Sequence, residues 1–269
     1  MNVVPLHACN DGEGAVPLTG AGNWTWLIPG RVPTLIDAGV GLPRHLDALE
    51  SALRGVRLAN VLVTHGHSDH ASGAAAVAVR MPEVRFLKMP WPERDHRWPV
   101  SWERIGDGDR IEAGEGALTA IHTPGHAPDH LCFWDARSRT LFGGDLLIDG
   151  SSVSIPATRG GDLGAYLASL ERVLALDPVR VLPAHGRVID RPAVLLRASI
   201  ARRRERERQI LELLAPGAID LDAIVTRLYA GLRESLVPHA RDTVLAHLLK
   251  LERERRAARD GEAWHIMEP

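Results

Sequence analysis

The sequence predicts an α+β protein in which a layered domain of strands and helices precedes a small, mainly helical domain. Two observations support this fold class. Short apolar stretches alternate with helical patterns over residues 24–184, and charged residues become frequent after Arg191. With 269 residues, 45% of them hydrophobic, the chain is long enough for one large core and a small appendage. We therefore expect one domain at 1–190 and another at 191–269.

The first domain combines β-rich stretches with three helical patterns. The β-rich stretches are expected at 24–37, 58–64, 84–87, 109–122, 130–143 and 179–184. The helical patterns are expected at 43–54, 70–80 and 162–176. Proline and tryptophan are frequent in 85–102, so we expect a loop over the sheet edge there. A hydrophobic plug is the favoured role for this loop because tryptophan usually packs, and a substrate lid is the alternative.

The second domain shows the pattern of a winged helix. A charged helix is expected to begin near Arg202 and to end at Pro216. A short helix with the apolar residues Leu221, Ile224, Val225 and Leu228 follows, and then a longer one near 238–256 with apolar residues at helical spacing. A tail containing Trp264 completes a module of three helices and a hairpin-like end.

The segment 64–70 is the strongest functional signal in the chain. It reads Thr-His-Gly-His-Ser-Asp-His and directly follows an apolar run that is expected to form a buried strand. Neutral imidazoles bind zinc, iron, nickel or copper, and a carboxylate adds a hard oxygen donor. A turn lets side chains one or two residues apart converge, so the segment predicts a metal-binding turn at a strand end.

Three further candidate ligands recur at expected strand ends. His126 follows the turn residues Pro124-Gly125, Asp145 follows two glycines, and His185 precedes a glycine after an apolar stretch. Each of them alone would more often be an ordinary loop residue. Their shared position favours a site that holds two metal ions.

The pattern HxHxDH, followed by His126, Asp145 and His185, resembles the metallo-β-lactamase superfamily of four-layer αββα hydrolases over roughly residues 20–190. The resemblance implies that His65, His67 and His126 bind one metal, that Asp69, His70 and His185 bind the second, and that Asp145 bridges the two. Asp69 and Asp145 are then the catalytic carboxylates. Asp37, after an early strand, is expected to orient a ligating imidazole.

The resemblance also implies the cofactor and the chemistry. Two divalent ions are expected, with zinc as the default and manganese or iron as alternatives. Such a pair, about 3.5–4 Å apart, lowers the pKa of a bridging water toward about 7, and the resulting hydroxide attacks an ester, thioester or phosphodiester.

Differences from other members of the superfamily argue against β-lactamase, flavo-diiron, lactonase and capped-nuclease activities. β-Lactamases of this fold lack an Asp at the position of Asp145, and flavo-diiron proteins carry Glu where this chain has His67. Lactonases of the fold have a Tyr shortly after the bridging Asp, which is missing here, and 146–184 is too short for a nuclease cap domain.

The C-terminal pattern resembles the β-lactamase-like protein 2 group, in which a winged helix follows the metallo-β-lactamase domain. Members of this group include a single-stranded-RNA endonuclease, and related forms are thioesterases. The resemblance therefore implies either a small acyl or thioester substrate or single-stranded RNA. Residues 191–269 hold fifteen Lys or Arg against twelve Asp or Glu. This excess of positive charge is weak, so RNA is the less favoured of the two substrates.

Other roles of the C-terminal module stay open. It could wall the active site or form a homodimer interface. A non-catalytic DNA-binding module is a further alternative, although 238–256 is only weakly basic.

The remaining expectations concern substrate contacts, thiols and location. Ser151, Arg159 and Arg187, together with Ser152, could contact a substrate anion because they lie near the ligand motifs. Cys9 and Cys132 are expected to be inert thiols. The N-terminus lacks a signal-peptide pattern and no long apolar run occurs, so a cytoplasmic protein without a membrane partner is expected.

Overall fold

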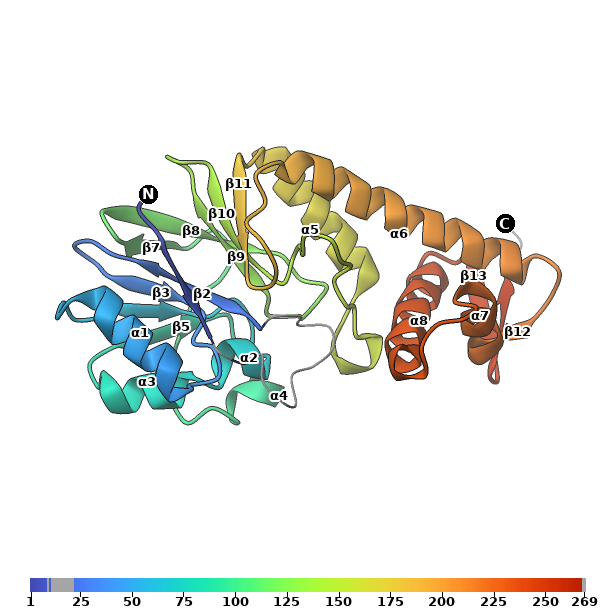
Figure 1. Cartoon of the computed structure of the whole chain (residues 1–269). Coiled ribbons are helices and arrows are strands. Elements are labelled where there is room, and N and C mark those ends of the chain that lie inside the picture. Colours follow the sequence, from blue (N-terminus) through green and yellow to red (C-terminus); the bar gives the residue numbers. More distant parts are fainter. Residues whose placement is uncertain (9, 11–21, 268–269) are drawn as a thin grey trace.

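The computed structural model describes residues 1–8, 10 and 22–267. Its larger part is a sandwich of two mixed β-sheets with helices on both outer faces, and its smaller part is a C-terminal module reached through one long helix (Figure 1). This four-layer αββα arrangement with an appended winged helix is the fold class that the sequence predicts.

The first sheet has the strand order β1-β2-β3-β4-β5-β6 and is parallel from β3 to β6. Its strands are β1 (Val4–His7), β2 (Trp24–Ile28), β3 (Thr34–Ile36), β4 (Asn60–Leu62), β5 (Arg85–Lys88) and β6 (Trp102–Arg104). Neighbouring residues point to opposite faces, so Val61 joins the outer core and Leu62 the core between the sheets. Helices α1 (Pro43–Leu53) and α3 (Ala74–Arg80) cover the outer face.

The second sheet has the order β11-β10-β9-β8-β7, with only β10 and β11 parallel. Its strands are β7 (Arg110–Ala113), β8 (Gly116–His122), β9 (Leu131–Asp135), β10 (Thr140–Gly144) and β11 (Arg180–Pro183). Phe133 and Phe142 are fully buried between the sheets. Helices α5 (Leu163–Leu176) and α6 (Pro192–Leu214) cover the outer face.

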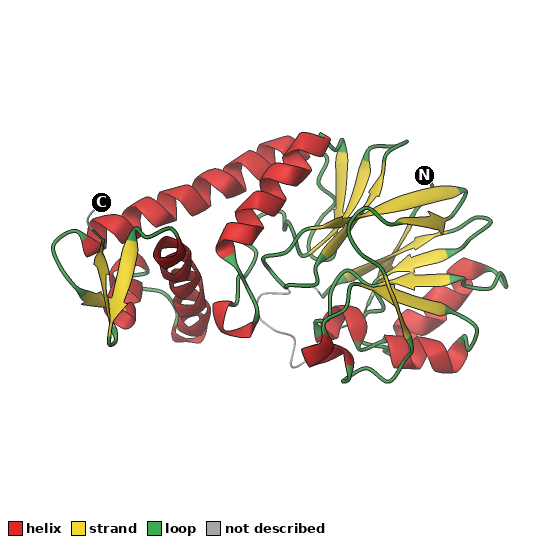
Figure 2. Cartoon of the chain, turned by 180° about the vertical axis from the view of Figure 1, so that it is seen from behind, coloured by secondary structure: helices red, strands yellow, loops and turns green. Residues whose placement is uncertain are grey.

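The C-terminal module is a winged helix built on the second half of α6 (Figure 2). Helices α7 (Leu221–Leu228) and α8 (Val237–Arg253) are joined through the short 3₁₀ helix η2 (Glu234–Leu236). A small sheet has the order β12-β14-β13, with β12 at Ile219–Asp220, β13 at Ala257–Asp260 and β14 at Ala263–Ile266. Trp264 of this sheet is buried in the core of the module.

Helix α6 belongs to both cores. Leu196 and Ile200 pack against the outer face of the second sheet, whereas Ile210 and Leu214 pack in the winged helix. The helix begins at Pro192, earlier than the charge pattern predicts, because proline is well suited to a first helical turn and Leu196 and Ile200 are buried. The predicted boundary between residues 190 and 191 thus lies just before this shared helix.

The helix predicted at 70–80 is divided into α2 (Ser68–Ala71) and α3. Gly73 lies at the division and packs against the loop after β3. A Cβ on Gly73 would be 2.1 Å from the carbonyl oxygen of Ala38, so only glycine allows this approach.

The strand predicted at 84–87 is β5, but the prediction of a loop over 85–102 is wrong for the rest of the segment, which contains the short helix α4 (Pro92–Asp95) and the start of β6. Parallel pairing between β5 and β6 outweighs the local breakers. Trp98 and Trp102 pack against the outer core, whereas Trp91 lies next to the metal-binding turn.

Cys132 is a buried free thiol, and burial raises its pKa to about 12. It is therefore inert, as predicted, whereas Cys9 lies outside the described residues. Within the part of the chain that the structure describes, no helix has the length and apolar character needed to span a membrane.

Candidate metal centre

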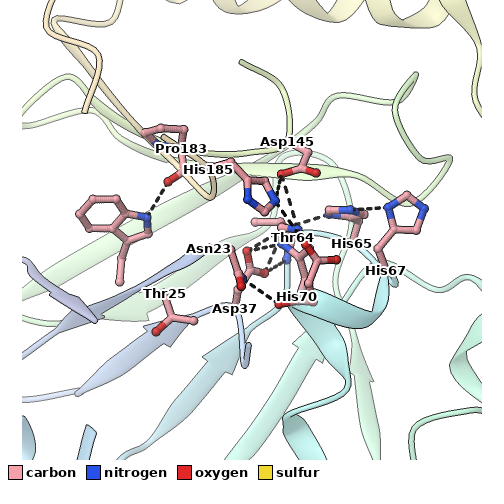
Figure 3. A network of polar contacts seen from close by, with 12 residues as sticks. Asn23, Thr25, Asp37, Thr64, His65, His67, His70, Asp145, Pro183 and His185 are labelled. Carbon is pink, nitrogen blue, oxygen red and sulfur yellow. Dashed lines mark hydrogen bonds and ion pairs between the residues drawn. The ribbon is translucent and has the colours of Figure 1, made fainter. Parts of the chain in front are cut away.

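The seven predicted ligands all follow the C-terminal ends of strands and meet at one edge of the sandwich. Figure 3 shows five of them, His65, His67, His70, Asp145 and His185. The segment from His65 to His70 leaves β4 and turns into α2, with His67 as the extended residue that precedes the helix. His126 lies in the loop between β8 and β9, Asp145 directly follows β10, and His185 follows β11. Strand ends of both sheets thus contribute to one site.

One group of ligand atoms is formed by three histidines. His67 Nδ1 is 2.9 Å from His65 Nε2 and 2.9 Å from His126 Nε2. These three nitrogens converge from two loops, and no aliphatic side chain separates them. They are the same three residues that the sequence assigns to one metal.

A second group combines Asp69, His70 and His185. Asp69 Oδ2 is 3.2 Å from His185 Nε2 and 3.5 Å from His70 Nε2. The ligand atoms within each of the two groups lie within 4.8 Å of one another. The second group is again the set that the sequence predicts.

Asp145 lies between the two groups, and its two oxygens face different ones. Oδ2 is 3.3 Å from His126 Nε2, whereas Oδ1 is 3.4 Å from His185 Nε2 and 3.5 Å from His70 Nε2. This is the placement that a bridging carboxylate requires.

Two buried atoms of the cluster need a partner of another kind. Among the described residues, His70 Nε2 and Asp145 Oδ1 have no hydrogen-bond partner although both are buried. Buried polar atoms are nearly always satisfied, so a missing partner here requires an explanation. Because all the donors are imidazole nitrogens and carboxylate oxygens, the residues fit two divalent cations.

The electrostatics at His65, His67 and Asp145 favour the protonation states of metal ligands, whereas neighbouring carboxylates raise the pKa of His70 and of His185 against the effect of burial. Burial, together with His70, lowers the pKa of His65, and burial with His126 lowers the pKa of His67 to about 2. Burial raises the pKa of Asp145, but His185 and His70 outweigh it and leave that pKa below its usual value. Neutral imidazoles and an ionised carboxylate are the forms that bind metals.

Asp37 holds one of the ligands from behind. Its Oδ2 is 2.8 Å from His70 Nδ1, which leaves Nε2 of the same ring facing the centre. The Asp37 carboxylate also accepts bonds from the backbone N–H of Thr64 at 2.7 Å and from its hydroxyl at 3.0 Å (Figure 3). Such contacts fix the ring orientation of a metal-bound histidine.

Comparisons with known proteins agree with this geometry. Residues 18–185 match the family model described as the metallo-beta-lactamase superfamily. The chain belongs to the metallo-β-lactamase superfamily. Residues 221–264 match a second model, the beta-lactamase associated winged helix domain. The residues of a binuclear metal site of this superfamily are therefore present.

Several curated proteins are similar to this member of the superfamily. "Lactamase-like protein adaB" of Aspergillus niger is 30% identical, over 90% of this chain and 78% of its own. The "Beta-lactamase-like protein 2 homolog" of Drosophila melanogaster is 29% identical, over 94% of this chain and 88% of its own. The "Atrochrysone carboxyl ACP thioesterase" of Pseudocercospora fijiensis is 28% identical, over 76% of this chain and 59% of its own.

Solved structures of the superfamily show the same fold. A beta-lactamase domain protein from Burkholderia ambifaria has a TM-score of 0.78 at 21% identity and covers 91% of this chain and 87% of its own. TTHA1623, solved in a di-iron-bound form, has a TM-score of 0.54 at 31% identity and covers 62% of this chain and 89% of its own.

Several groups that support the ligands carry no motif that the sequence would reveal. The backbone carbonyl of Ser154 lies 2.7 Å from His126 Nδ1. The side chain of Asn23 donates to the carbonyl of Asp69 at 2.8 Å. His130 accepts the N–H of Asp145 at 3.0 Å and thereby orients that residue.

The predicted substrate contacts lie outside the two ligand groups. Arg187 binds Asp149, the hydroxyl of Ser152 accepts a bond from Arg202, and Ser151 is exposed in the same loop. Arg159 belongs to the 3₁₀ helix η1 (Ala157–Arg159). Their contact with substrate stays a prediction.

Proposed function

We propose that this superfamily member is a dinuclear metal hydrolase that cleaves thioesters. The assignment as a dinuclear metal hydrolase rests on the position of Asp145, whose two oxygens face separate groups of ligand atoms. The choice of a thioester as the substrate is supported by the similarity to the ACP thioesterase of Pseudocercospora fijiensis.

The residues divide into ligands and supports. His65, His67 and His126 would hold one cation and Asp69, His70 and His185 the other, and Asp145, between the two groups, would serve both. When bound, the two cations supply a nucleophilic water at neutral pH and stabilise the negative charge of the transition state. Asp37 and His130 keep His70 and Asp145 in the required orientation.

Zinc is our default for both positions. Iron is the main alternative, because a similar protein was solved in a di-iron-bound form. Manganese also accepts this ligand set. Elemental analysis of protein purified from its native host separates these assignments.

The charges of the winged helix favour a small substrate over RNA. Several of its cations are within ion-pair distance of carboxylates: Lys250 and Arg256 contact Glu207, Arg253 contacts Asp162, and Arg241 contacts Asp222. Binding to a nucleic-acid backbone depends on cations that are free to neutralise phosphates. Paired cations contribute less to such binding.

The test compares thioesters with RNA. Metal-loaded protein and the His65→Ala variant are incubated with acyl thioesters of N-acetylcysteamine and of coenzyme A, and the released thiol is measured. End-labelled single-stranded RNA is treated in parallel. We expect thiol release by the wild type only. RNA cleavage that disappears in His65→Ala, without thiol release, would show the endonuclease instead.

A further inference from the structure

An aromatic ring and a guanidinium lie directly beside the first group of ligands. The ring centroid of Trp91 is 6.0 Å from that of His67. The guanidinium carbon of Arg94 is 4.7 Å from the centroid of the Trp91 ring. Arg94 and the predicted ligand His67 therefore both lie next to the same aromatic ring.

The backbone at two glycines lies close to this pair. A Cβ added to Gly66, between two ligating histidines, would lie 3.4 Å from Trp91 Cε3 and 3.6 Å from Arg94 Cβ. A Cβ added to Gly160, directly after η1, would lie 3.3 Å from Trp91 Cζ2. Trp91 thus fills the space between the metal-binding turn and the loop that carries Arg159, which makes it a wall of the site.

The charge of Arg94 is not balanced by its surroundings. Among the described residues no carboxylate lies within ion-pair distance of Arg94, whereas the buried Asp129 nearby contacts Lys88 at 3.1 Å. Partial burial and the neighbouring cations Arg97 and Arg159 lower the pKa of Arg94, and Asp129 opposes them more weakly, without forming an ion pair. Arg159 has only a distant partner, Asp242, at 3.8 Å.

An arginine without an ion pair among the described residues, next to a second arginine whose partner is 3.8 Å away, suits an anionic ligand. A guanidinium binds carboxylate and phosphate oxygens through two parallel hydrogen bonds, and stacking on an aromatic ring keeps its plane in position. A metal centre attracts the carbonyl end of a substrate, so the second anchor would lie a short chain away from it.

We propose that Arg94, stacked on Trp91 and assisted by Arg159, binds an anionic group that the substrate carries near its reacting thioester. The inference rests on the proposed thioesterase function. The shared chemistry is an oxyanion, which is either a carboxylate on the acyl group or a phosphate on the thiol. The closeness of Arg94 to His67 favours the acyl carboxylate, because the phosphates of coenzyme A lie at the far end of a long arm.

The experiment measures kcat/KM for matched pairs of thioesters. In the first arm, glutaryl and pentanoyl thioesters share the neutral thiol N-acetylcysteamine and differ only in the terminal carboxylate. In the second arm, pentanoyl-coenzyme A is compared with pentanoyl-N-acetylcysteamine. Wild type, Arg94→Gln, Arg94→Lys and the control Arg80→Gln are measured; Arg80 lies on α3 and pairs with Asp47.

We expect the wild type to prefer the anionic partner in the first arm. Arg94→Gln should reduce this preference at least about tenfold, mainly through KM, and Arg94→Lys should retain part of it. Arg80→Gln should keep the wild-type ratio. A preference confined to the second arm and lost in Arg94→Gln would also support the site and assign it to the thiol phosphate.

Two results would count against the inference in different ways. Thioester hydrolysis without any anionic preference, or with a preference that survives in Arg94→Gln, would overturn the inference and leave the proposed function intact. Failure to hydrolyse every thioester would overturn the proposed function and the inference that rests on it.

Discussion

Asp162 and Arg253 join the two parts of the molecule, through hydrogen bonds of 2.6 and 2.9 Å between the carboxylate and the guanidinium. Asp162 also caps α5 by accepting the N–H of Ala165 at 3.0 Å, and its own N–H donates to the carbonyl of Gly125 at 2.8 Å. Gly125 directly precedes the predicted ligand His126. The winged helix is therefore connected to the predicted ligand His126 through two intermediate residues, Asp162 and Gly125.

Arg253→Ala should weaken metal binding because it frees Asp162 and the loop that carries His126. We expect a severalfold lower metal affinity in chelator competition, while the free energy of unfolding falls by less than about 1 kcal/mol, since the pair is partly exposed. The matched control is Arg241→Ala, which breaks an ion pair with Asp222 inside the winged helix. Equal metal affinities for the two variants would show that this connection has no influence on the site.

Lys88 and Asp129 form a buried ion pair behind the metal-binding turn. Lys88 Nζ is 2.6 Å from Asp95 Oδ1 and 3.1 Å from Asp129 Oδ2, and that oxygen of Asp129 also accepts the N–H of Gly66 at 2.8 Å. Lys88→Met would leave a buried carboxylate without its cation. We expect a loss of about 3–5 kcal/mol in the free energy of unfolding, measured with urea.

The double variant Lys88→Met/Asp129→Asn checks the cause of that loss. It removes both charges of the pair and should recover part of the lost stability, because the amide oxygen of the substituted side chain can still accept the N–H of Gly66. A double variant no more stable than Lys88→Met alone would assign the loss to packing of the lysine side chain instead.

The metal ligands could be predicted because each has a local signal. His65, His67, Asp69 and His70 lie within six residues, and the three later ligands stand beside Gly at strand ends. The Lys88–Asp129 pair could not be predicted in this way. A lysine in a strand is normally exposed, and its burial depends on a carboxylate forty-one positions later that only the tertiary fold brings near.

The start of α6 likewise could not be predicted from local sequence. Residues 192–201 lack the dense charge pattern that marks the helix after Arg202, and their helical state depends on packing of Leu196 and Ile200 against the second sheet. Propensity alone is a weak guide where tertiary contacts decide. In contrast, α7 lies where the sequence predicts a short helix, because its apolar residues recur at helical spacing.

Asp145→Ala should abolish turnover and leave the fold largely intact. The side chain is the only described group that faces both sets of ligands, so its loss should lower the number of bound metal ions per chain. Thiol release, metal content and circular dichroism are measured together, with Asp47→Ala on α1 as the control. A near-normal rate in Asp145→Ala with metal still bound would contradict the bridging role.

The protonation of His247, on α8, is expected to make the stability of the protein depend on pH. Among the described residues, neither ring nitrogen has a hydrogen-bond partner. Burial, followed by Arg203, Arg206 and Lys250, lowers the pKa of His247 to about 3. The unfolded chain, with a histidine pKa near 6.5, therefore binds more protons between these two values, so stability is lost as the pH falls below about 6.5.

Replacing His247 should remove this part of the acid sensitivity. Between pH 7 and pH 5 the free energy of unfolding of His247→Leu should decrease by about 2 kcal/mol less than that of the wild type, because 1.5 pH units below the unfolded pKa correspond to that amount. His247→Gln, which is polar and does not titrate, should show the same difference. Urea denaturation at both pH values measures it, and parallel losses in wild type and both variants would show that His247 is protonated in the folded protein.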